Sequence, residues 1–169
     1  MSHLWQNLRH LSAAGSPVYA VPLTIAMGVT ELRIYVDAST RRRDVTGLGL
    51  VIRDATDALI GWHACTTRGM TNNEAEYEAL LFGLRTVLPY RPQHLLVHAD
   101  SQVVIDQMNG ASAVRSQKLA PRYRQARQMV QQFAIVRLRH IPREWNVLAD
   151  AMAEDAVVRD EARGRKPPP

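Results

Sequence analysis

The fold is decided by the stretch ELRIYVD at residues 31–37. In this stretch Leu32, Ile34 and Val36 alternate with polar or amphipathic residues, and a period of two is typical of a half-buried β-strand. The strand closes on Asp37, where the chain leaves the sheet. We therefore expect a strand that brings a carboxylate to the edge of a sheet.

The elements that follow are expected from hydrophobic periodicity and turn residues. Two more strands are predicted at residues 47–53 and 58–67, and their short connection favours antiparallel neighbours. Helical apolar spacing then runs over residues 71–88 and stops at Pro89. The later elements are expected in the order strand 95–98, helix 101–108, helix 117–133, strand 134–140 and helix 146–158.

This order predicts an α/β domain with a five-stranded mixed sheet flanked by helices on both faces. We assign the domain to residues 31–160. Residues 1–30 contain no acidic residue and are interrupted by glycine and proline, which predicts a poorly ordered leader. Residues 161–169 form a basic and proline-rich tail that is expected to be disordered.

Composition limits the possible classes of protein. The formal net charge is +5, and 19 of the 21 cationic residues are arginine, whose planar fork suits phosphate; genomic base composition is the alternative explanation. No apolar run reaches the ~20 residues of a membrane-spanning helix, so no membrane association is expected. Cys65 is the only cysteine, which excludes an internal disulfide and fits a reducing cytoplasm. Its apolar surroundings predict a buried, inert thiol.

Two carboxylates stand at matching strand ends. Asp37 closes the first strand, and Asp100 follows the apolar strand at residues 95–98. Taken alone, Asp37 is explained by a turn and Asp100 by a helix N-cap. We expect the two strands to be neighbours, which would place their ends near each other. The pair therefore indicates a site.

Two more acids, Glu76 and Asp150, lie near the starts of helices. The alternative is that each is a surface acid stabilised by the helix dipole. Four acids that converge without cationic partners repel one another, and divalent metal is the usual solution. Two Mg²⁺ ions ~3.5–4 Å apart can clamp a phosphodiester and activate water. Oxygen ligands favour Mg²⁺ or Mn²⁺ over Zn²⁺.

Four motifs occur in order: YVDAS at residues 35–39, TNNEAEY at 71–77, ADSQ at 99–102 and NVLAD at 146–150. Together they resemble the motifs of type 1 ribonuclease H, in its compact subgroup without a basic protrusion. The resemblance covers roughly residues 32–158. It implies a ribonuclease-H-like fold and an endoribonuclease that hydrolyses the RNA strand of an RNA–DNA hybrid by a two-metal-ion mechanism. No obligate protein partner is expected.

The resemblance also implies roles for individual residues. Asp37 would bridge two Mg²⁺ ions, with Mn²⁺ as a substitute. Glu76 and Asp100 would complete the ion on the leaving-group side, and Asp150 would hold the ion that activates water. Glu76 could also sense the ribose 2′-hydroxyl. His140 resembles the family's histidine that assists proton transfer or product release; the alternative is a histidine that closes a strand.

Six positions match those that the family uses around the hybrid: Ser39, Thr71, Asn72, Asn73, Gln102 and Asn146. The structural alternative is strong for Thr and Asn, because these residues also cap helices. Two departures from the family pattern concern the hybrid, and the first of them predicts weaker hybrid binding. Residues 111–132 lack the family's Lys/Trp-rich insertion, and no arginine stands at the spacing of the family's phosphate pocket, with Arg68 only near it.

One basic region offers compensation. Residues 111–143 contain no acid before Arg143 and hold eight cationic residues: Arg115, Lys118, Arg122, Arg124, Arg127, Arg137, Arg139 and Arg143. We hypothesise that part of this surface follows backbone phosphates. The alternative is a solvated helix face and strand edge.

Three other functions remain open at this stage, because fold alone does not determine function. The chain could be a catalytically idle nucleic-acid-binding module on the same fold, although all four acids are present. It could be a nuclease of this fold with a different nucleic-acid substrate. It could also be a partner domain for a polymerase or a transposition system.

Overall fold

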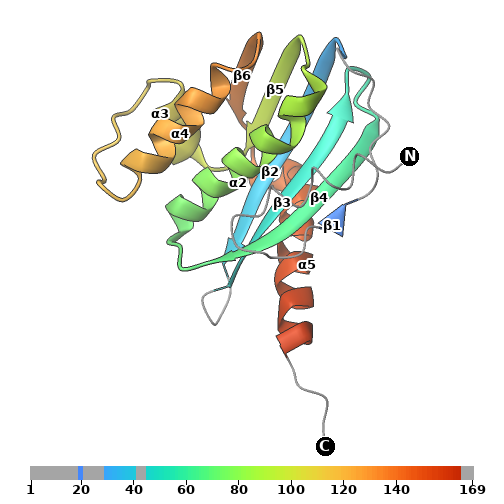
Figure 1. The fold of residues 1–169 in the computed structure, drawn as a ribbon, viewed down its shortest axis with the longest axis vertical. Coiled ribbons are helices and arrows are strands. Elements are labelled where there is room, and N and C mark those ends of the chain that lie inside the picture. Colours follow the sequence, from blue (N-terminus) through green and yellow to red (C-terminus); the bar gives the residue numbers. More distant parts are fainter. Residues whose placement is uncertain (1–18, 21–28, 41–44, 165–169) are drawn as a thin grey trace, which may run out of the picture.

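The computed structural model describes residues 19–20, 29–40 and 45–164. These residues form one mixed β-sheet with helices on both faces (Figure 1). The strands are β1 (Tyr19–Ala20), β2 (Glu31–Thr40), β3 (Val45–Asp54), β4 (Leu59–Arg68), β5 (His94–Ala99) and β6 (Ile135–His140). Their order across the sheet is β1-β4-β3-β2-β5-β6. Strands β2, β3 and β4 form an antiparallel meander, and β5 and β6 continue the sheet in parallel from β2.

The helices are α2 (Asn72–Val87), α3 (Gln102–Met108), α4 (Ala120–Val130) and α5 (Val147–Gly164), with 3₁₀ turns η2 (Leu88–Tyr90) and η3 (Arg143–Trp145). Figure 1 shows α2, α3 and α4 on one face of the sheet and α5 on the other. Helix α2 gives way to η2 at Pro89, as expected for a residue without an N–H group. The predicted α/β class is confirmed, as is the element order from β2 to α5, and β1 adds a sixth strand to the five that were predicted.

The core lies between helix α2 and the face of the sheet that β2 presents to it. Leu32, Ile34 and Val36 are each at most 1% exposed, and burial of such side chains is worth about 1.5–3 kcal/mol each. Gly83 lets α2 come close, because a Cβ atom at this position would lie 2.6 Å from Cγ1 of Val36. The packing therefore fixes the strand that carries Asp37. This strand does not close on Asp37 as predicted, because residues 38–40 stay paired with β3 and β2 ends at Thr40.

Helix α5 rests directly on the backbone of β3. A Cβ atom at Gly47 would collide with the carbonyl oxygen of Ala153, and one at Gly49 would collide with that of Ala149. Residues without a side chain on the strand and small residues on the helix permit this close approach. The contact matters for the site because α5 carries Asp150 in its first turn.

Two differences from the predicted boundaries have physical explanations. Strand β1 pairs antiparallel with β4 inside the expected leader, where the outer edge of β4 offers unpaired backbone groups. Helix α5 runs to Gly164, past the predicted domain end at residue 160, and Asp160 accepts a hydrogen bond from Arg68 at 2.9 Å. The other leader residues, 1–18 and 21–28, and tail residues 165–169 lie outside the described part.

The predicted environment of the single cysteine is confirmed. Cys65 is buried in the core, and burial raises the pKa of its thiol to about 12. Such a thiol is not ionised at neutral pH and is a poor nucleophile. Within the described ranges, no helix is both long enough and apolar enough to cross a bilayer.

Candidate active site

Three carboxylates from three elements meet at one end of β2. Asp37 stands on β2, Glu76 lies near the start of α2, and Asp100 directly follows β5. Carboxylate oxygens of the three residues lie within 4.8 Å of one another. The register explains part of this convergence, because the parallel strands pair Tyr35 with His98, two residues before each aspartate. The expectation that Asp37 and Asp100 share a sheet edge is confirmed.

Burial and mutual repulsion disfavour charge in this three-acid cluster. Asp37 is 4% exposed. Its burial, followed by the nearby charges of Glu76 and Asp100, raises its pKa to about 9. Burial, followed by the charge of Asp100, raises the pKa of Glu76 to about 8. A divalent cation would remove this repulsion and favour the ionised carboxylates, so the cluster is suited to bind one.

Asp150 reaches the same cleft from helix α5. The cleft has a volume of about 280 Å³ and is lined by the four acids together with Ala38, Ser39, Thr40, Asn72 and Arg143. Asp150 lies outside the three-acid cluster, and its Oδ1 accepts a hydrogen bond from Nη2 of Arg143 at 3.3 Å. After burial and the neighbouring charges, a hydrogen bond with Asp150 also contributes to the raised pKa of Asp37.

Asn146 links the segments that carry Asp37 and Asp100. This residue is 1% exposed, and its Nδ2 donates to the carbonyl oxygen of Val36 at 3.0 Å and to Oδ1 of Asp100 at 3.3 Å. Asn146, the residue directly before α5, therefore connects the start of this helix to β2 and to the acid that follows β5. Its Oδ1 is buried without a hydrogen-bond partner among the described residues. The sequence placed Asn146 among the substrate contacts, whereas these bonds give it a positioning role.

His140 lies beside Asp100, one of the four acids. It ends β6, and its Nε2 lies 3.2 Å from the backbone oxygen of Asp100. The side chain is exposed, so it is accessible to a bound substrate and to solvent. This position agrees with both readings of the residue, the closing residue of a strand and a group that handles protons. Its catalytic role stays a prediction.

The remaining predicted substrate contacts differ in their surroundings. Ser39 and Asn72 line the cleft. Thr71 is the N-cap of α2, where it forms a capping box with Glu74, as the structural alternative expected. Asn73 is exposed in the first turn of α2. Gln102 is exposed, and its Nε2 donates to Oδ1 of Asp106 at 2.6 Å.

Sequence reasoning missed the position of Arg143 in the cleft. It was counted only as part of the basic region, although it lines the cleft together with the four acids and its side chain is 77% exposed. The charge of Asp150 is the main cause that raises the pKa of Arg143. A signal was present, because Arg143 sits seven residues before Asp150 in the connection that follows His140.

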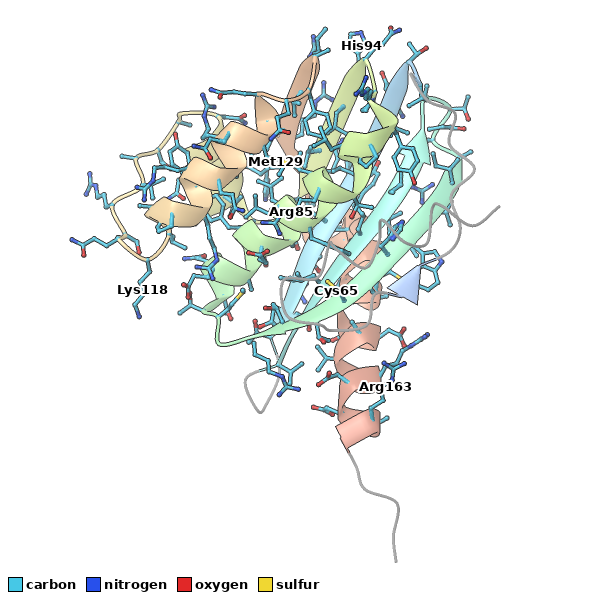
Figure 2. All side chains as sticks on the ribbon, viewed as in Figure 1. Cys65, Arg85, His94, Lys118, Met129 and Arg163 are labelled. Carbon is cyan, nitrogen blue, oxygen red and sulfur yellow. The ribbon has the colours of Figure 1, made fainter. Side chains whose placement is uncertain are left out.

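The structure divides the basic region into groups with different surroundings. Arg122 forms ion pairs with Glu74 at 2.9 Å and with Glu78 at 3.8 Å, and Arg127 donates to the carbonyl oxygen of Met108 at 3.1 Å. These two arginines therefore have structural partners. Lys118, in the connection before α4, extends from the surface (Figure 2).

A family model described as "Reverse transcriptase-like" matches residues 35–156, a span that includes all four acids. Among solved structures, ribonuclease H1 from the archaeon Halobacterium salinarum gives a TM-score of 0.73 at 27% identity and covers 76% of this chain and 98% of that one. The chain belongs to the type 1 ribonuclease H family. The family resemblance and the ribonuclease-H-like fold predicted from the four motifs are confirmed.

Two other members of the family bear on function. LC11-ribonuclease H1, solved in complex with an RNA/DNA hybrid, is 26% identical with a TM-score of 0.72, over 76% of this chain and 98% of that chain. The bifunctional protein Rv2228c of Mycobacterium tuberculosis is 36% identical over 87 residues, which are 52% of this chain. The matched region is 24% of that relative, so this chain spans about a quarter of its length.

Proposed function

We propose that this chain is an endoribonuclease that hydrolyses the RNA strand of RNA–DNA hybrids by a two-metal-ion mechanism. The observation that carries the proposal is the cluster of Asp37, Glu76 and Asp100, whose carboxylate oxygens lie within 4.8 Å in a cleft that Asp150 also lines. Membership of the type 1 ribonuclease H family supports the reaction class. The hybrid bound to LC11-ribonuclease H1 supports the substrate class.

The donor set fits a pair of hard divalent cations. All four acids offer oxygen, the ligand atom that Mg²⁺ and Mn²⁺ prefer, and no histidine or cysteine belongs to the cluster among the described residues. In the proposal, Asp37, Glu76 and Asp100 would hold one ion, and Asp37 and Asp150 would hold the second. Bound Mg²⁺ or Mn²⁺ would lower the pKa of a water nucleophile and neutralise charge on the leaving oxygen.

The other residues of the cleft have supporting roles in this proposal. Asn146 fixes the orientation of the Asp100 carboxylate through its side-chain amide. His140, beside Asp100, would accept or release a proton as product leaves. Ser39 and Asn72 line the cleft and would contact the hybrid, and Glu76 would meet the ribose 2′-hydroxyl that distinguishes RNA from DNA.

A substrate panel tests the proposal. The full chain is incubated with Mg²⁺ or Mn²⁺ and a labelled RNA–DNA hybrid, beside duplex DNA, duplex RNA and each single strand. We expect cleavage of the RNA strand of the hybrid alone. Asp150→Asn should abolish this cleavage, because the variant loses one of the four acids. Asp155→Asn is its matched control and should keep the activity, because Asp155 lies on the same helix but pairs with Arg159 away from the cleft.

The other outcomes separate the alternatives. Equal cleavage of duplex DNA would favour a nuclease of the same fold with a different substrate. Binding of the hybrid without cleavage under either metal would favour an idle binding module. A reducing, cytoplasmic setting is part of the proposal, supported by the single buried thiol of Cys65. That the chain acts without an obligate protein partner stays a prediction.

A further inference from the structure

The face of the sheet that carries α5 is covered only in part. Helix α5 packs against β2, β3 and β4 (Figure 1). The side chains that β5 and β6 direct to the same face therefore lie beside α5 and not beneath it. The strand register identifies two neighbouring rows of side chains on this face: Arg33, Leu96 and Arg137 in one row, and Tyr35, His98 and Arg139 in the next. We call this surface, together with Arg53 and Trp145, the aromatic–arginine face.

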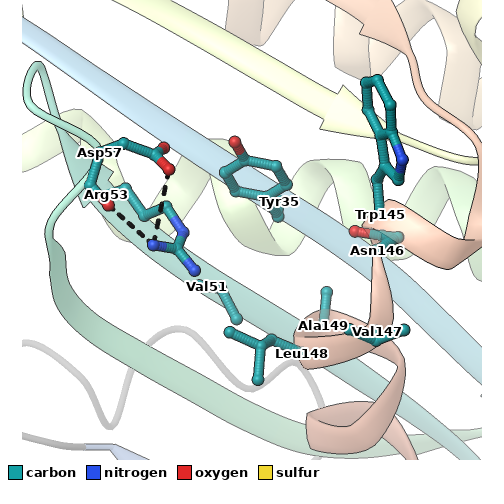
Figure 3. Close-up of a pocket in the computed structure, with 9 residues that line it drawn as sticks. All are labelled: Tyr35, Val51, Arg53, Asp57, Trp145, Asn146, Val147, Leu148 and Ala149. Atoms are coloured by element: carbon teal, nitrogen blue, oxygen red, sulfur yellow. Dashed lines mark hydrogen bonds and ion pairs between the residues drawn. The ribbon is translucent and has the colours of Figure 1, made fainter.

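Aromatic side chains form the centre of this face. The rings of Tyr35 and His98 are stacked, with centroids 4.6 Å apart and an interplanar angle of 16°. His98 is buried, at 9% exposed, and Tyr35 is partly exposed, so Tyr35 is the ring of this pair that a ligand can reach. The guanidinium of Arg53 lies 5.9 Å from the centroid of the Tyr35 ring. Trp145 lines the same cleft as Tyr35, which has a volume of about 170 Å³ (Figure 3). Trp145 is 70% exposed, so its indole is accessible to a planar ligand.

The unneutralised charge of the face lies on β6. Arg33 is paired with Glu31 at 2.9 Å, and both Arg33 and Arg53 lie 3.7 Å from Asp57. Arg137 and Arg139 are exposed and have no ion-pair partner in the part of the chain that the structure describes. Because Val136 and Leu138 pack against the core, the two arginines project to the opposite face, away from α4. Two free cations therefore border the aromatic stack.

We propose that the aromatic–arginine face binds single-stranded nucleic acid. Bases would stack on Trp145 and beside Tyr35, while backbone phosphates would follow Arg137 and Arg139. Aromatic rings beside a positively charged track are the usual way in which proteins hold single strands without reading sequence, because every base has a π-face. A sheet face that exposes aromatic and basic residues is also a known platform for unpaired RNA.

The face adjoins the acidic cleft. Trp145 directly precedes Asn146, whose amide contacts Asp100 at 3.3 Å. An unpaired strand that leaves the cleft on this side would therefore reach the face without crossing the core. The proposal does not depend on hydrolysis, and binding can be measured in a chain that lacks catalysis. Arginine on an edge strand also protects it from pairing with another chain, but that role gives no function to the exposed indole.

The test is a fluorescence anisotropy titration. The full chain carrying Asp37→Asn is titrated, without divalent metal, into labelled oligothymidylate and oligouridylate. We expect Trp145→Ala to weaken binding about tenfold or more, because stacking contributes strongly per base, and Trp145→Phe to retain most of the affinity. Charge reversal of Arg137 and Arg139 to Glu should weaken binding and flatten its salt dependence. Binding of either strand with this dependence on Trp145 supports the proposal.

The matched control reverses two exposed cations elsewhere, Arg115→Glu with Lys118→Glu, in the connection between α3 and α4 (Figure 2). It makes the same change in net charge on the other side of the sheet, and we expect little loss of binding. An equal loss in this control would show that net charge alone attracts the strand and would overturn the proposal.

The second readout is fluorescence quenching, which does not depend on a variant with altered stability. Oligonucleotide should quench the fluorescence of the parent chain more than that of Trp145→Phe. Unchanged affinity in both the Trp145→Ala and the charge-reversed chains, with circular dichroism showing native folding, would overturn the proposal. A change in self-association of Trp145→Ala without any change in oligonucleotide binding would also overturn it and would identify the face as a protein-docking surface.

Discussion

The side-chain amide of Asn146 donates to the carboxylate of Asp100 at 3.3 Å, across 46 positions of sequence. The same amide donates to the carbonyl oxygen of Val36, the residue before Asp37, at 3.0 Å. One buried side chain thus contacts β2 directly before Asp37 and the acid that follows β5, at the point where α5 begins. The geometry of the cleft depends on this residue as well as on the acids themselves.

Asn146→Ala should therefore reduce both stability and activity. The substitution leaves the buried carbonyl of Val36 without its donor, which costs about 1–3 kcal/mol, and it frees the Asp100 carboxylate to turn. Urea unfolding and hybrid cleavage measure the two effects. Asn109→Ala is the matched control, because its amide also donates to a strand carbonyl, that of Leu138, but at an exposed position away from the cleft. Equal losses in the two variants would contradict the positioning role.

The metal-free chain should lose stability as pH rises. The pKa of Asp37 is raised from 3.8 to about 9 and that of Glu76 from 4.5 to about 8, with burial as the main cause. Between these limits the folded state binds more protons than the unfolded state, so the free energy of unfolding falls with rising pH. Unfolding by urea in the presence of a chelator, from about pH 4 to about pH 9, measures the slope.

Asp37→Asn provides the control for this pH effect. An amide cannot ionise, so the variant should show a smaller slope and should be more stable than the parent at the alkaline end, by an amount on the order of a few kcal/mol. A parent chain whose stability rises steadily over the same window, or an equal slope in the variant, would contradict the account of the three-acid cluster.

Divalent metal should stabilise the folded chain. Mg²⁺ binds ionised carboxylates that exist as a cluster only in the folded state, and a ligand at ~100 times its Kd adds about 2.7 kcal/mol to the free energy of unfolding. Thermal unfolding with and without Mg²⁺ measures the effect at constant ionic strength. Asp37→Asn should lose most of the stabilisation, whereas Asp155→Asn should keep it.

The close contact between β3 and α5 should make Gly49 intolerant of a side chain. In Gly49→Ala the new Cβ would collide with the carbonyl oxygen of Ala149, and overpacking of this kind typically costs about 1–3 kcal/mol. The helix must move, so Asp150 should move with it and activity should fall. Gly110→Asn is the control, because Gly110 has a φ of 78° but no neighbour within 4 Å. Asn tolerates this conformation.

The parts predicted well from sequence are those that follow from local patterns. The alternation in residues 31–37 predicted most of β2, which continues to Thr40. The positions of Asp37 late in β2 and of Asp100 directly after β5 predicted that the two acids would meet. Parallel pairing brings such strand ends to one edge, so a short stretch of sequence was sufficient. The capping box at Thr71 and Glu74 was likewise readable from spacing alone.

The features of the fold and of the site that could not be predicted from sequence depend on contacts between distant residues. Asparagine at position 146, directly before a helix, is also explained as a helix cap. Only the fold shows that its amide reaches Val36 and Asp100. Strand β1 is two residues long and carries no periodic signal. Sequence could not separate the arginines of the basic region that have structural partners from those that have none within the described residues. The direction of Arg137 and Arg139, for example, depends on which face of β6 packs against the core.

The central claim is that the four carboxylates act as one metal-dependent centre for hydrolysis. Its most direct test is single-turnover cleavage of a labelled RNA–DNA hybrid by the parent chain and by Asp37→Asn, each with Mg²⁺ and with a chelator. The account predicts cleavage only by the parent chain and only with metal. Cleavage by the parent chain in chelator, or undiminished cleavage by Asp37→Asn, would contradict it.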